Sequence, residues 1–175
     1  MKSVWRKRPA AMRHDLSKWV RGKGSLTGHI MSKCGNFAVR HVENRFSPAN
    51  LDEISRIGVK PKESALVREV YLCCGTKPIV FAHSVAARSS LKGRWRHLRF
   101  LGQKSLGSAF LADPKVRRDE LEFLLLSARH PLFMKACRFM KHRPGKLWAR
   151  RSLFALGRNS ILVTEVFLPE ILERA

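Results

Sequence analysis

Charged residues interrupt two of the most apolar stretches of this chain. Glu165 lies in the run Ile161 to Leu168, and Arg68 lies in the run Leu66 to Leu72. Apolar runs of this length are typical of strands that are covered on both faces. A charged side chain in such a strand needs a partner or a ligand, because an unpaired buried charge is strongly unfavourable. We therefore predict that the two residues line a closed polar pocket for a small anionic molecule.

A structural ion pair is the alternative explanation of these charges. Arg68 also has an acidic neighbour, Glu69, directly after it in the chain. Successive residues of a strand point to opposite faces, so Glu69 is poorly placed to neutralise Arg68. The sequence thus leaves two roles open for Arg68 and Glu165, a structural pair or a ligand site.

The other apolar segments predict an antiparallel sheet. Turn residues separate two pairs of strand-like segments, so each pair is expected to form a hairpin. The pairs are 64–73 with 79–88, around the turn 74–78, and 147–156 with 160–168, around the turn 157–159. Residues 37–42 predict a first strand, and residues 119–127 fit either a strand or a helix. About six strands with interspersed helices indicate a single α+β domain.

Short helices are expected between the strands. One covers residues 10–20, and another covers residues 51–57, with Asn50 or Ser47 as its N-cap and Gly58 at its end. Weaker helical signals lie at residues 91–101 and 108–111.

The chain is predicted to divide at a flexible connection. Gly22, Gly24 and Gly28 loosen the backbone after the first helix. We therefore separate a basic N-terminal arm or helix, residues 1–24, from a main domain, residues 25–175. Within that domain, residues 128–146 are basic and ambiguous in period, and we interpret them as a partly helical surface insertion.

The charge of the chain is strongly positive. It has 35 Lys and Arg against 13 Asp and Glu, a formal net charge of +22. This charge predicts attraction to nucleic acid, anionic lipid or acidic metabolites, unless it is only a solvated surface. Residues 123–164 contain no acid and nine Lys and Arg, interleaved with Phe133, Phe139 and Trp148. A basic nucleic-acid-binding module is therefore an alternative function.

The cysteines and histidines show no metal-binding pattern. Cys73 and Cys74 are adjacent and so point to opposite faces of a strand, and neither pairs with Cys34 or Cys137 in a CxxC motif. Reduced thiols in a cytoplasmic protein are the expected state. No HExxH motif occurs, and we expect His83, inside a strand, to be structural.

Other common signals are also missing from the sequence. No stretch reaches the roughly 18 apolar residues of a membrane span, and no apolar segment follows the basic N-terminus as in a secretory signal. Residues 102–108 have the glycines of a phosphate loop, but Ser108 stands where the lysine is required. The backbone N–H groups of this segment are suited instead to a carboxylate.

Four short segments follow one another in an order that is similar to a known enzyme family. They are residues 68–73 (Arg-Glu-Val-Tyr-Leu-Cys), 101–107 (Leu-Gly-Gln-Lys-Ser-Leu-Gly), 147–152 (Leu-Trp-Ala-Arg-Arg-Ser) and 164–169 (Thr-Glu-Val-Phe-Leu-Pro). Together they resemble the bacterial chorismate pyruvate-lyase family. The resemblance covers roughly residues 60–170 and extends weakly to Trp19 and residues 25–27.

The resemblance implies an antiparallel sheet with helical flaps that enclose the ligand. It implies a monomeric enzyme that converts chorismate to 4-hydroxybenzoate and pyruvate, the first committed step of ubiquinone biosynthesis, with no metal or organic cofactor. By motif position, Arg68 would hold the ring carboxylate, assisted by the backbone N–H groups of Leu106 and Leu26. Glu165 would meet the hydroxyl end of the ring. A non-catalytic relative that only retains the aromatic acid is a further possibility.

Overall fold

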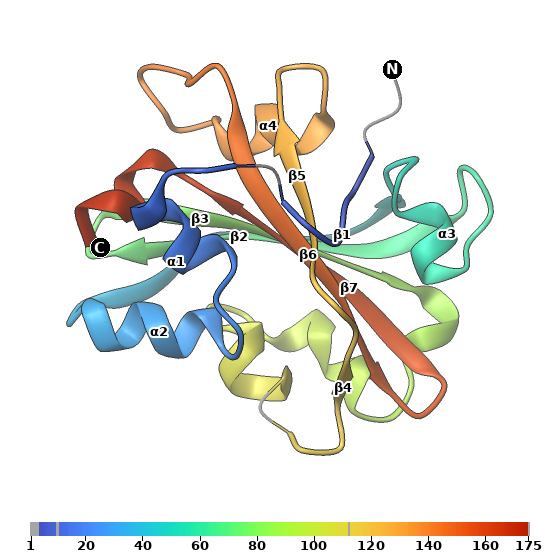
Figure 1. Ribbon diagram of the computed structural model, residues 1–175. Coiled ribbons are helices and arrows are strands. Elements are labelled where there is room, and N and C mark those ends of the chain that lie inside the picture. Colours follow the sequence, from blue (N-terminus) through green and yellow to red (C-terminus); the bar gives the residue numbers. More distant parts are fainter. Residues whose placement is uncertain (1–3, 10, 112, 175) are drawn as a thin grey trace.

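An antiparallel sheet forms the centre of the molecule (Figure 1). The computed structural model describes residues 4–9, 11–111 and 113–174, and that part of the chain contains seven strands in one sheet. Their order is β1-β2-β3-β7-β6-β4, and β5 also pairs with β6. The bounds are β1 Phe37–Pro48, β2 Ser64–Cys74, β3 Lys77–Ala87, β4 Arg117–Arg118, β5 Glu122–Leu126, β6 Leu147–Leu156 and β7 Asn159–Phe167. The predicted α+β fold is confirmed, with one strand more than the six expected.

Both predicted hairpins are confirmed, and each turns at a glycine. Gly75 and Thr76 join β2 to β3, with Gly75 at φ 62°, and Gly157 and Arg158 join β6 to β7, with Gly157 at φ 61°. A positive φ is unfavourable for a residue with a Cβ, so glycine favours these tight turns. The second turn is one residue shorter than predicted, because Asn159 already belongs to β7.

The strands β1 and β5 differ in how closely they match the predictions. β1 continues to Pro48, well past the predicted end at residue 42, and its register against β2 shifts between Arg40 and Glu43. Such a bulge interrupts the alternation from which strand length is predicted. The segment 119–127 forms a strand and not a helix, since β5 pairs antiparallel with β6.

Helices and shorter helical segments connect the strands. They are α1 His14–Val20, α2 Leu26–Lys33, α3 Ile54–Ile57, α4 Pro131–Ala136, the 3₁₀ segments η1 Arg88–Ser90, η2 Gly93–Phe100 and η4 Pro169–Arg174, and the π-helical turn η3 Gly107–Leu111. Within the described ranges, none of the helices combines the length and the apolar character that crossing a bilayer requires. α1 is shorter than predicted, and residue 10, its predicted start, lies outside the described residues.

The boundaries of α2 and α3 correct two predictions. α2 lies where Gly28 indicates a loose backbone, because Ser25 caps the helix and its Oγ accepts a hydrogen bond from the Gly28 N–H at 3.1 Å. α3 ends at Gly58 with φ 68°, as predicted, but the cap expected at Asn50 or Ser47 is wrong. Glu53 is the N-cap residue, and its Oε2 accepts from the backbone N–H of Asn50 at 2.9 Å.

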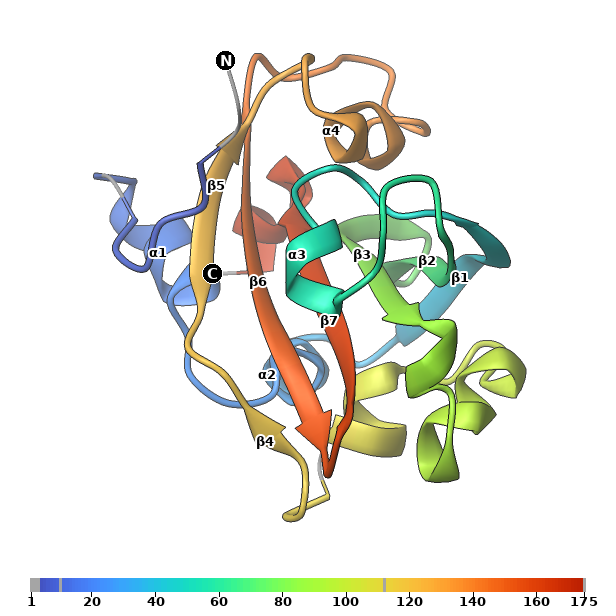
Figure 2. The same cartoon turned by 90° about the vertical axis from the view of Figure 1, so that its right-hand side faces the viewer.

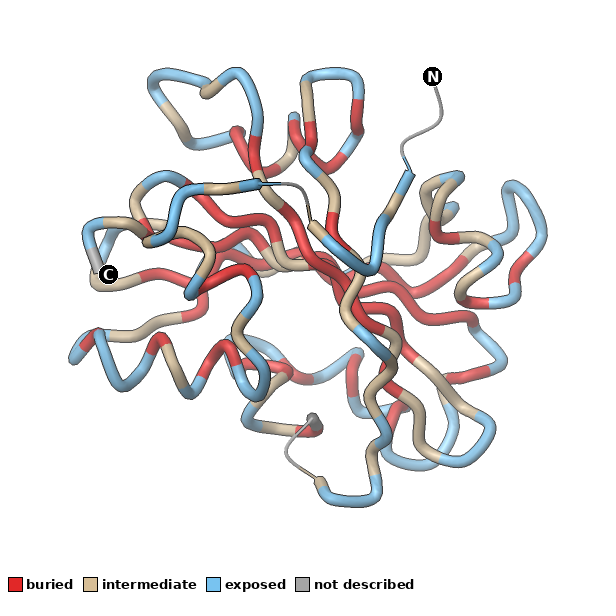
Figure 3. Tube along the Cα trace, in the orientation of Figure 1, coloured by how far each residue is buried: buried red, intermediate tan, exposed pale blue. Residues whose placement is uncertain are grey.

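The helices cover the two faces of the sheet (Figure 2). α1, α2, η2 and η3 pack on the face to which Arg68 points, where Trp19, Ile30 and Trp95 are buried. α3 and α4 pack on the opposite face, together with Val67. The buried part of the chain follows the central strands between these layers (Figure 3).

Residues 128–146 belong partly to the core. α4 lies in this segment, so its partly helical character is confirmed. The interpretation as a surface insertion is wrong for α4, because Leu132, Phe133 and Ala136 are at most 2% exposed and pack against the sheet. α4 has only six residues and lies among many basic ones, so the sequence shows no clear helical period that would predict its apolar side.

The N-terminal segment packs against the rest of the chain. Trp19 and Val20 of α1 are buried in the same cluster as Val70 and Leu72 of β2. The division of the chain at residue 24 stays a prediction. Residues 1–3 and 10 of the proposed arm and residues 112 and 175 of the proposed main domain lie outside the described residues.

A disulfide joins Cys34, at the C-terminal end of α2, to Cys74, at the end of β2. The prediction of reduced thiols is therefore wrong for this pair, whose Cα atoms are 5.8 Å apart. Sequence spacing does not reveal it, because the two cysteines are 40 residues apart and meet only through the fold. Cys73 and Cys137 are free and buried, and burial raises the pKa of both thiols.

Candidate active site

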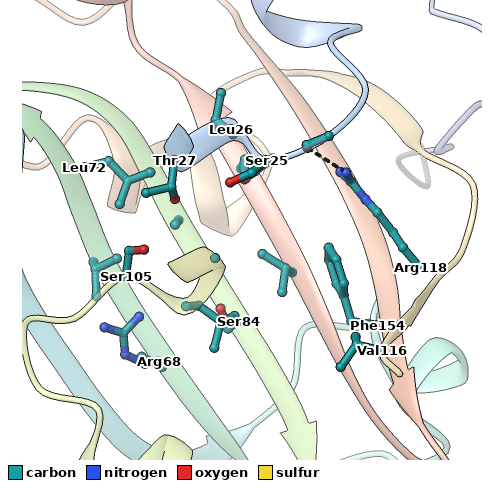
Figure 4. Close-up of a pocket in the computed structure, with 17 residues that line it drawn as sticks. Ser25, Leu26, Thr27, Arg68, Leu72, Ser84, Ser105, Val116, Arg118 and Phe154 are labelled. Carbon is teal, nitrogen blue, oxygen red and sulfur yellow. Dashed lines mark hydrogen bonds between the residues drawn. The ribbon is translucent and has the colours of Figure 1, made fainter. Parts of the chain in front are cut away.

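A cavity of about 320 Å³ lies between the sheet and the segments that cover the Arg68 face. Alternate residues of a strand point the same way, so β2, β3 and β7 each contribute every second side chain. These residues are Arg68, Val70 and Leu72 on β2, Ala82 and Ser84 on β3, and Val163 and Glu165 on β7. Gly24, Ser25, Leu26, Thr27, Ser105, Leu106, Gly107, Val116, Arg118 and Phe154 complete the lining, shown in Figure 4.

All four residues predicted for the site line this cavity: Arg68, Glu165, Leu26 and Leu106. β2 and β7 both pair with β3, which sets Arg68 opposite Ser84 and Glu165 opposite Ala82. With strands about 4.8 Å apart and a rise of about 3.4 Å per residue, the Cα atoms of Arg68 and Glu165 are roughly 12 Å apart. The fold thus brings the two charges to one cavity without pairing them with each other.

Arg68 is a buried cation whose charge faces the cavity. It is 3% exposed, and its Nη2 donates to the carbonyl oxygens of Gly102 and Lys104 at 3.0 and 2.9 Å. Its Nε has no hydrogen-bond partner among the described residues. Burial lowers the pKa of Arg68 to about 10, so the guanidinium is still protonated at neutral pH. The glycine-containing loop therefore positions Arg68 through its carbonyl groups.

Glu165 is neutralised by a residue that the sequence analysis did not identify. Arg150 faces it across β6 and β7, and Arg150 Nε donates to Glu165 Oε2 at 2.5 Å. The side chain of Arg150 is 1% exposed, whereas that of Glu165 is 18% exposed. Arg150 therefore lies behind Glu165, which presents its carboxylate to the cavity.

Arg150 also connects Glu165 to the N-terminal segment. Its Nη1 donates to the carbonyl oxygen of Gly22 at 2.7 Å and lies 3.4 Å from those of Trp19 and Val20. The last carbonyl groups of a helix lack partners within it, so a guanidinium at this end stabilises α1. One arginine thus fixes both the carboxylate and the start of the segment that leads to Leu26.

Glu69 lies in a separate network on the other face of the sheet, as its alternation with Arg68 predicts. Its Oε1 is 2.9 Å from His83 Nδ1, and Glu53 Oε1 is 3.0 Å from His83 Nε2. Burial disfavours the charged imidazole, but the two carboxylates outweigh it and raise the pKa of His83 to about 9. His83 is buried away from the cavity, in agreement with the structural role predicted for it.

Two segments meet over the cavity and carry the predicted backbone donors. Leu26 is the first residue of α2, where a backbone N–H has no acceptor within the helix. Leu106 precedes Gly107, and a Cβ atom on Gly107 would lie only 2.9 Å from Thr27 Oγ1. The absence of a side chain at Gly107 therefore allows the two segments to touch. These segments are the helical flaps expected over the ligand.

Arg118 is a second cation in the lining, and no sequence pattern marks it. It lies in the two-residue strand β4 and pairs with Phe154, with its guanidinium carbon 5.1 Å from the centre of that ring. Its Nη1 donates to Gly24 O at 2.9 Å, and its Nε lacks a partner among the described residues. Burial and the nearby Arg150 hold the pKa of Arg118 below its usual range, although Glu165 acts in the opposite direction.

The donors around the cavity suit an anion. Guanidinium groups, helix-terminal N–H groups and hydroxyl groups donate hydrogen bonds to oxygen, and planar guanidinium fits a carboxylate in a bidentate manner. Among the described residues, no group of three or more His, Cys, Asp or Glu side chains is arranged to hold a metal ion.

Comparison with known proteins assigns this architecture to a family. The family model described as chorismate lyase matches residues 2–175. The chain belongs to the chorismate lyase family. The probable chorismate pyruvate-lyase of Nitrosospira multiformis is 49% identical over 174 residues, covering 99% of this chain and 97% of the relative. That of Nitrosomonas europaea is 44% identical over 168 residues, covering 96% and 94%. The family predicted from four ordered motifs is therefore confirmed.

Solved structures share the fold of this chorismate lyase family member at much lower identity. The C-terminal domain of PhnF superimposes with a TM-score of 0.59 at 13% identity, covering 77% of this chain and 83% of that one. The ligand-binding domain of a GntR-family transcriptional regulator from Bordetella bronchiseptica gives 0.53 at 15% identity, covering 77% and 90%. At such identities the likeness concerns the fold alone.

Proposed function

We propose that this protein converts chorismate to 4-hydroxybenzoate and pyruvate. The observation that carries the proposal is the placement of Arg68, a buried guanidinium with no carboxylate partner among the described residues, in the same cavity as Glu165. Family membership supports the choice of chorismate, since the relatives named above are probable chorismate pyruvate-lyases.

The ring carboxylate of chorismate would bind at Arg68. A guanidinium forms two parallel charge-assisted hydrogen bonds with a carboxylate, which lysine cannot reproduce. The backbone N–H groups of Leu106 and Leu26 would complete this anion site. Glu165, at the other end of the cavity floor, would accept a hydrogen bond from the ring hydroxyl group.

The reaction does not require a strong nucleophile. The bond between a ring carbon and the ether oxygen of the enolpyruvyl group breaks, and the neighbouring carbon, which bears the hydroxyl group, loses its proton. The ring becomes aromatic, and the released enolpyruvate becomes pyruvate when its methylene carbon takes up a proton. Orientation of the ring and exclusion of water are then the main contributions of the protein. The apolar floor and the touching flaps supply both, and Glu165 is the residue beside the proton that leaves.

The finer parts of the function follow from the same proposal. We expect a cytoplasmic monomer that uses no metal or organic cofactor and supplies 4-hydroxybenzoate for ubiquinone biosynthesis. The competing function, nucleic-acid binding, relies on the net charge of +22 and on aromatic stacking. Phe133, one of the three aromatic residues considered for stacking, is buried in the core at 2% exposure, which weakens that alternative.

One assay separates these functions. Purified protein is incubated with chorismate in the presence of a metal chelator, and 4-hydroxybenzoate is followed by absorbance, with Arg68→Met as the control variant. We expect product well above the spontaneous rate for the wild-type protein and almost none for the variant. Binding of 4-hydroxybenzoate without turnover would indicate a non-catalytic relative. Absence of both, together with salt-dependent binding of nucleic acid, would favour the competing function.

A further inference from the structure

Two guanidinium groups line the same cavity, one on the buried Arg68 and one on the half-buried Arg118, and only Arg68 has a role in the proposed function. Arg68 lies on β2 and Arg118 on β4, which are separated by β3, β7 and β6 in the order of the sheet. Figure 4 shows the two side chains on different sides of the lining, with Ser84 between them in this view. Neither forms an ion pair with a carboxylate of the described residues, and each has an unpartnered Nε.

The charge of the lining is therefore not balanced by the protein. Glu165 is the acidic residue of the lining, and it is already paired with Arg150 behind it. Arg68 and Arg118 are left with two positive charges that face one cavity. An unpaired charge removed from water is costly unless a ligand neutralises it, fully for the buried Arg68 and in part for the half-buried Arg118. Two separated cations fit a ligand with two separated anionic groups.

The position of Arg118 fits one particular group of chorismate. When the ring carboxylate is at Arg68 and the ring hydroxyl at Glu165, the enolpyruvyl ether is on the carbon next to the hydroxyl. Its carboxylate then lies toward the Glu165 end of the cavity. Arg118 is at that end, because its Nη1 donates to Gly24 O at 2.9 Å, two residues after Gly22, whose carbonyl accepts from Arg150, the partner of Glu165, at 2.7 Å.

We propose that Arg118 binds the second carboxylate of the substrate, the one carried by the enolpyruvyl group. This inference rests on the proposed function and adds a residue that recognises the leaving group. The product 4-hydroxybenzoate lacks this carboxylate, so Arg118 favours binding of the dianionic substrate over the monoanionic product. Its hydrogen bond to Gly24, just before α2, places this recognition next to the flap that covers the cavity.

A pair of stable ligands tests the assignment without turnover. 3-(Carboxymethoxy)-4-hydroxybenzoate carries a second carboxylate on an ether next to the hydroxyl group, and 3-ethoxy-4-hydroxybenzoate has an uncharged substituent of similar size. Dissociation constants of both are measured for the wild-type protein, Arg118→Met and Arg118→Lys. Arg117→Met is the matched control, because Arg117 is the neighbouring arginine of β4 and is exposed.

We expect Arg118→Met to weaken binding of the dianionic ligand by about 10- to 100-fold, the range of a charge-assisted hydrogen bond. Binding of the ethoxy ligand should change less than about threefold, and Arg118→Lys should recover part of the loss because it keeps the charge. Arg117→Met should bind both ligands like the wild-type protein. For chorismate itself, kcat/KM should fall in the same order as affinity for the dianionic ligand.

Three results would overturn the assignment. An equal loss for both ligands would show that Arg118 acts only through Phe154 and Gly24 on the shape of the cavity. Unchanged binding of the dianionic ligand would show that its second carboxylate lies elsewhere. A selective loss shared by Arg117→Met would point to a general surface effect of charge. Each of these differs from failure of the proposed function, in which the wild-type protein does not convert chorismate.

Discussion

Arg150 and Glu165 occupy opposite positions of β6 and β7, and their side chains are joined by a hydrogen bond of 2.5 Å between Nε and Oε2. Arg150 is nearly inaccessible to solvent and also holds the carbonyl groups at the end of α1. The carboxylate of the candidate active site is therefore oriented by a partner that does not line the cavity.

Removal of either partner from this pair is expected to destabilise the protein. Glu165→Leu leaves the Arg150 guanidinium buried without a counter-charge, and Arg150→Met has the converse effect, each at about 3–5 kcal/mol. The double variant should lose less free energy of unfolding than the sum of the two single variants. The free energies of unfolding of the wild-type protein, the two single variants and the double variant are measured by urea unfolding. Additive losses would contradict a coupled pair.

Arg68 is expected to dominate the binding of the aromatic acid. Arg68→Met should weaken the binding of 4-hydroxybenzoate by about 2–5 kcal/mol, because the ligand carboxylate loses a desolvated charge partner. Arg68→Lys should recover little, since an ammonium group cannot form two parallel hydrogen bonds. Isothermal titration calorimetry gives the affinities, with Arg117→Met as an exposed control. Wild-type affinity in Arg68→Met would remove Arg68 from the carboxylate site.

The contact between the two flaps depends on Gly107. Gly107→Ala brings a Cβ to within 2.9 Å of Thr27 Oγ1 and 3.4 Å of Thr27 Cβ, closer than such atoms normally approach in proteins, so the Thr27 side chain or the flaps that carry the two residues must shift. We expect the dissociation rate of 4-hydroxybenzoate to rise several-fold in stopped-flow measurements. Thr27→Ala removes the hydroxyl oxygen, so the double variant should return toward the wild-type rate. No change in Gly107→Ala would show that the flaps do not retain the ligand.

The disulfide between Cys34 and Cys74 is expected to stabilise the fold. It closes a loop of 40 residues, for which the chain-entropy estimate is about 4 kcal/mol. Reduction by dithiothreitol should therefore lower the urea midpoint of the wild-type protein. A Cys34→Ser/Cys74→Ser variant, which has no disulfide to reduce, should not respond to dithiothreitol. Four titratable thiols in the unfolded, unreduced protein would contradict the pairing.

The network of His83, Glu53 and Glu69 predicts how stability changes with pH. The pKa of His83 is raised to about 9 in the folded protein, against about 6.5 in an unfolded chain. The protonated His83 contributes up to about 3 kcal/mol to the free energy of unfolding. This contribution is fully present below pH 6.5 and is lost as pH rises through 9. His83→Gln should flatten this part of the stability profile, measured by urea unfolding from pH 6 to 10. Parallel profiles for the two proteins would show that His83 is not charged when folded.

The sequence patterns predict the sheet well because its hairpins are local. Alternation and turn glycines are enough to place β2 with β3 and β6 with β7. They are less reliable for register. A three-residue turn at 157–159 would set Arg151 opposite Glu165, whereas the observed two-residue turn sets Arg150 there. The pairing of Arg150 with Glu165 could therefore be predicted from the sequence, but only with the correct turn length. A register shift of one residue moves every side chain of the strand to the other face of the sheet.

Other parts of the site depend on contacts between distant segments. Arg118 lies in a polar stretch that becomes a strand only through its pairing with β6. The Cys34–Cys74 pair and the contact of Gly107 with Thr27 likewise require that α2 already lies against the sheet. Local periodicity carries no information on such contacts, so these features could not be predicted from it. Arg68 and Glu165 were predictable because a charge within an apolar strand is conspicuous in any fold.

The central claim is that one cavity, with Arg68 and Glu165 at its floor, cleaves chorismate. A single-turnover reaction tests it most directly, with enzyme in excess over chorismate and both products quantified from quenched samples. We predict that 4-hydroxybenzoate and pyruvate form in equal amounts with the wild-type protein. Arg68→Met and Glu165→Gln should each slow this step by at least about 100-fold. Chorismate that remains intact beside the wild-type protein, or that is cleaved equally fast by both variants, would contradict the account.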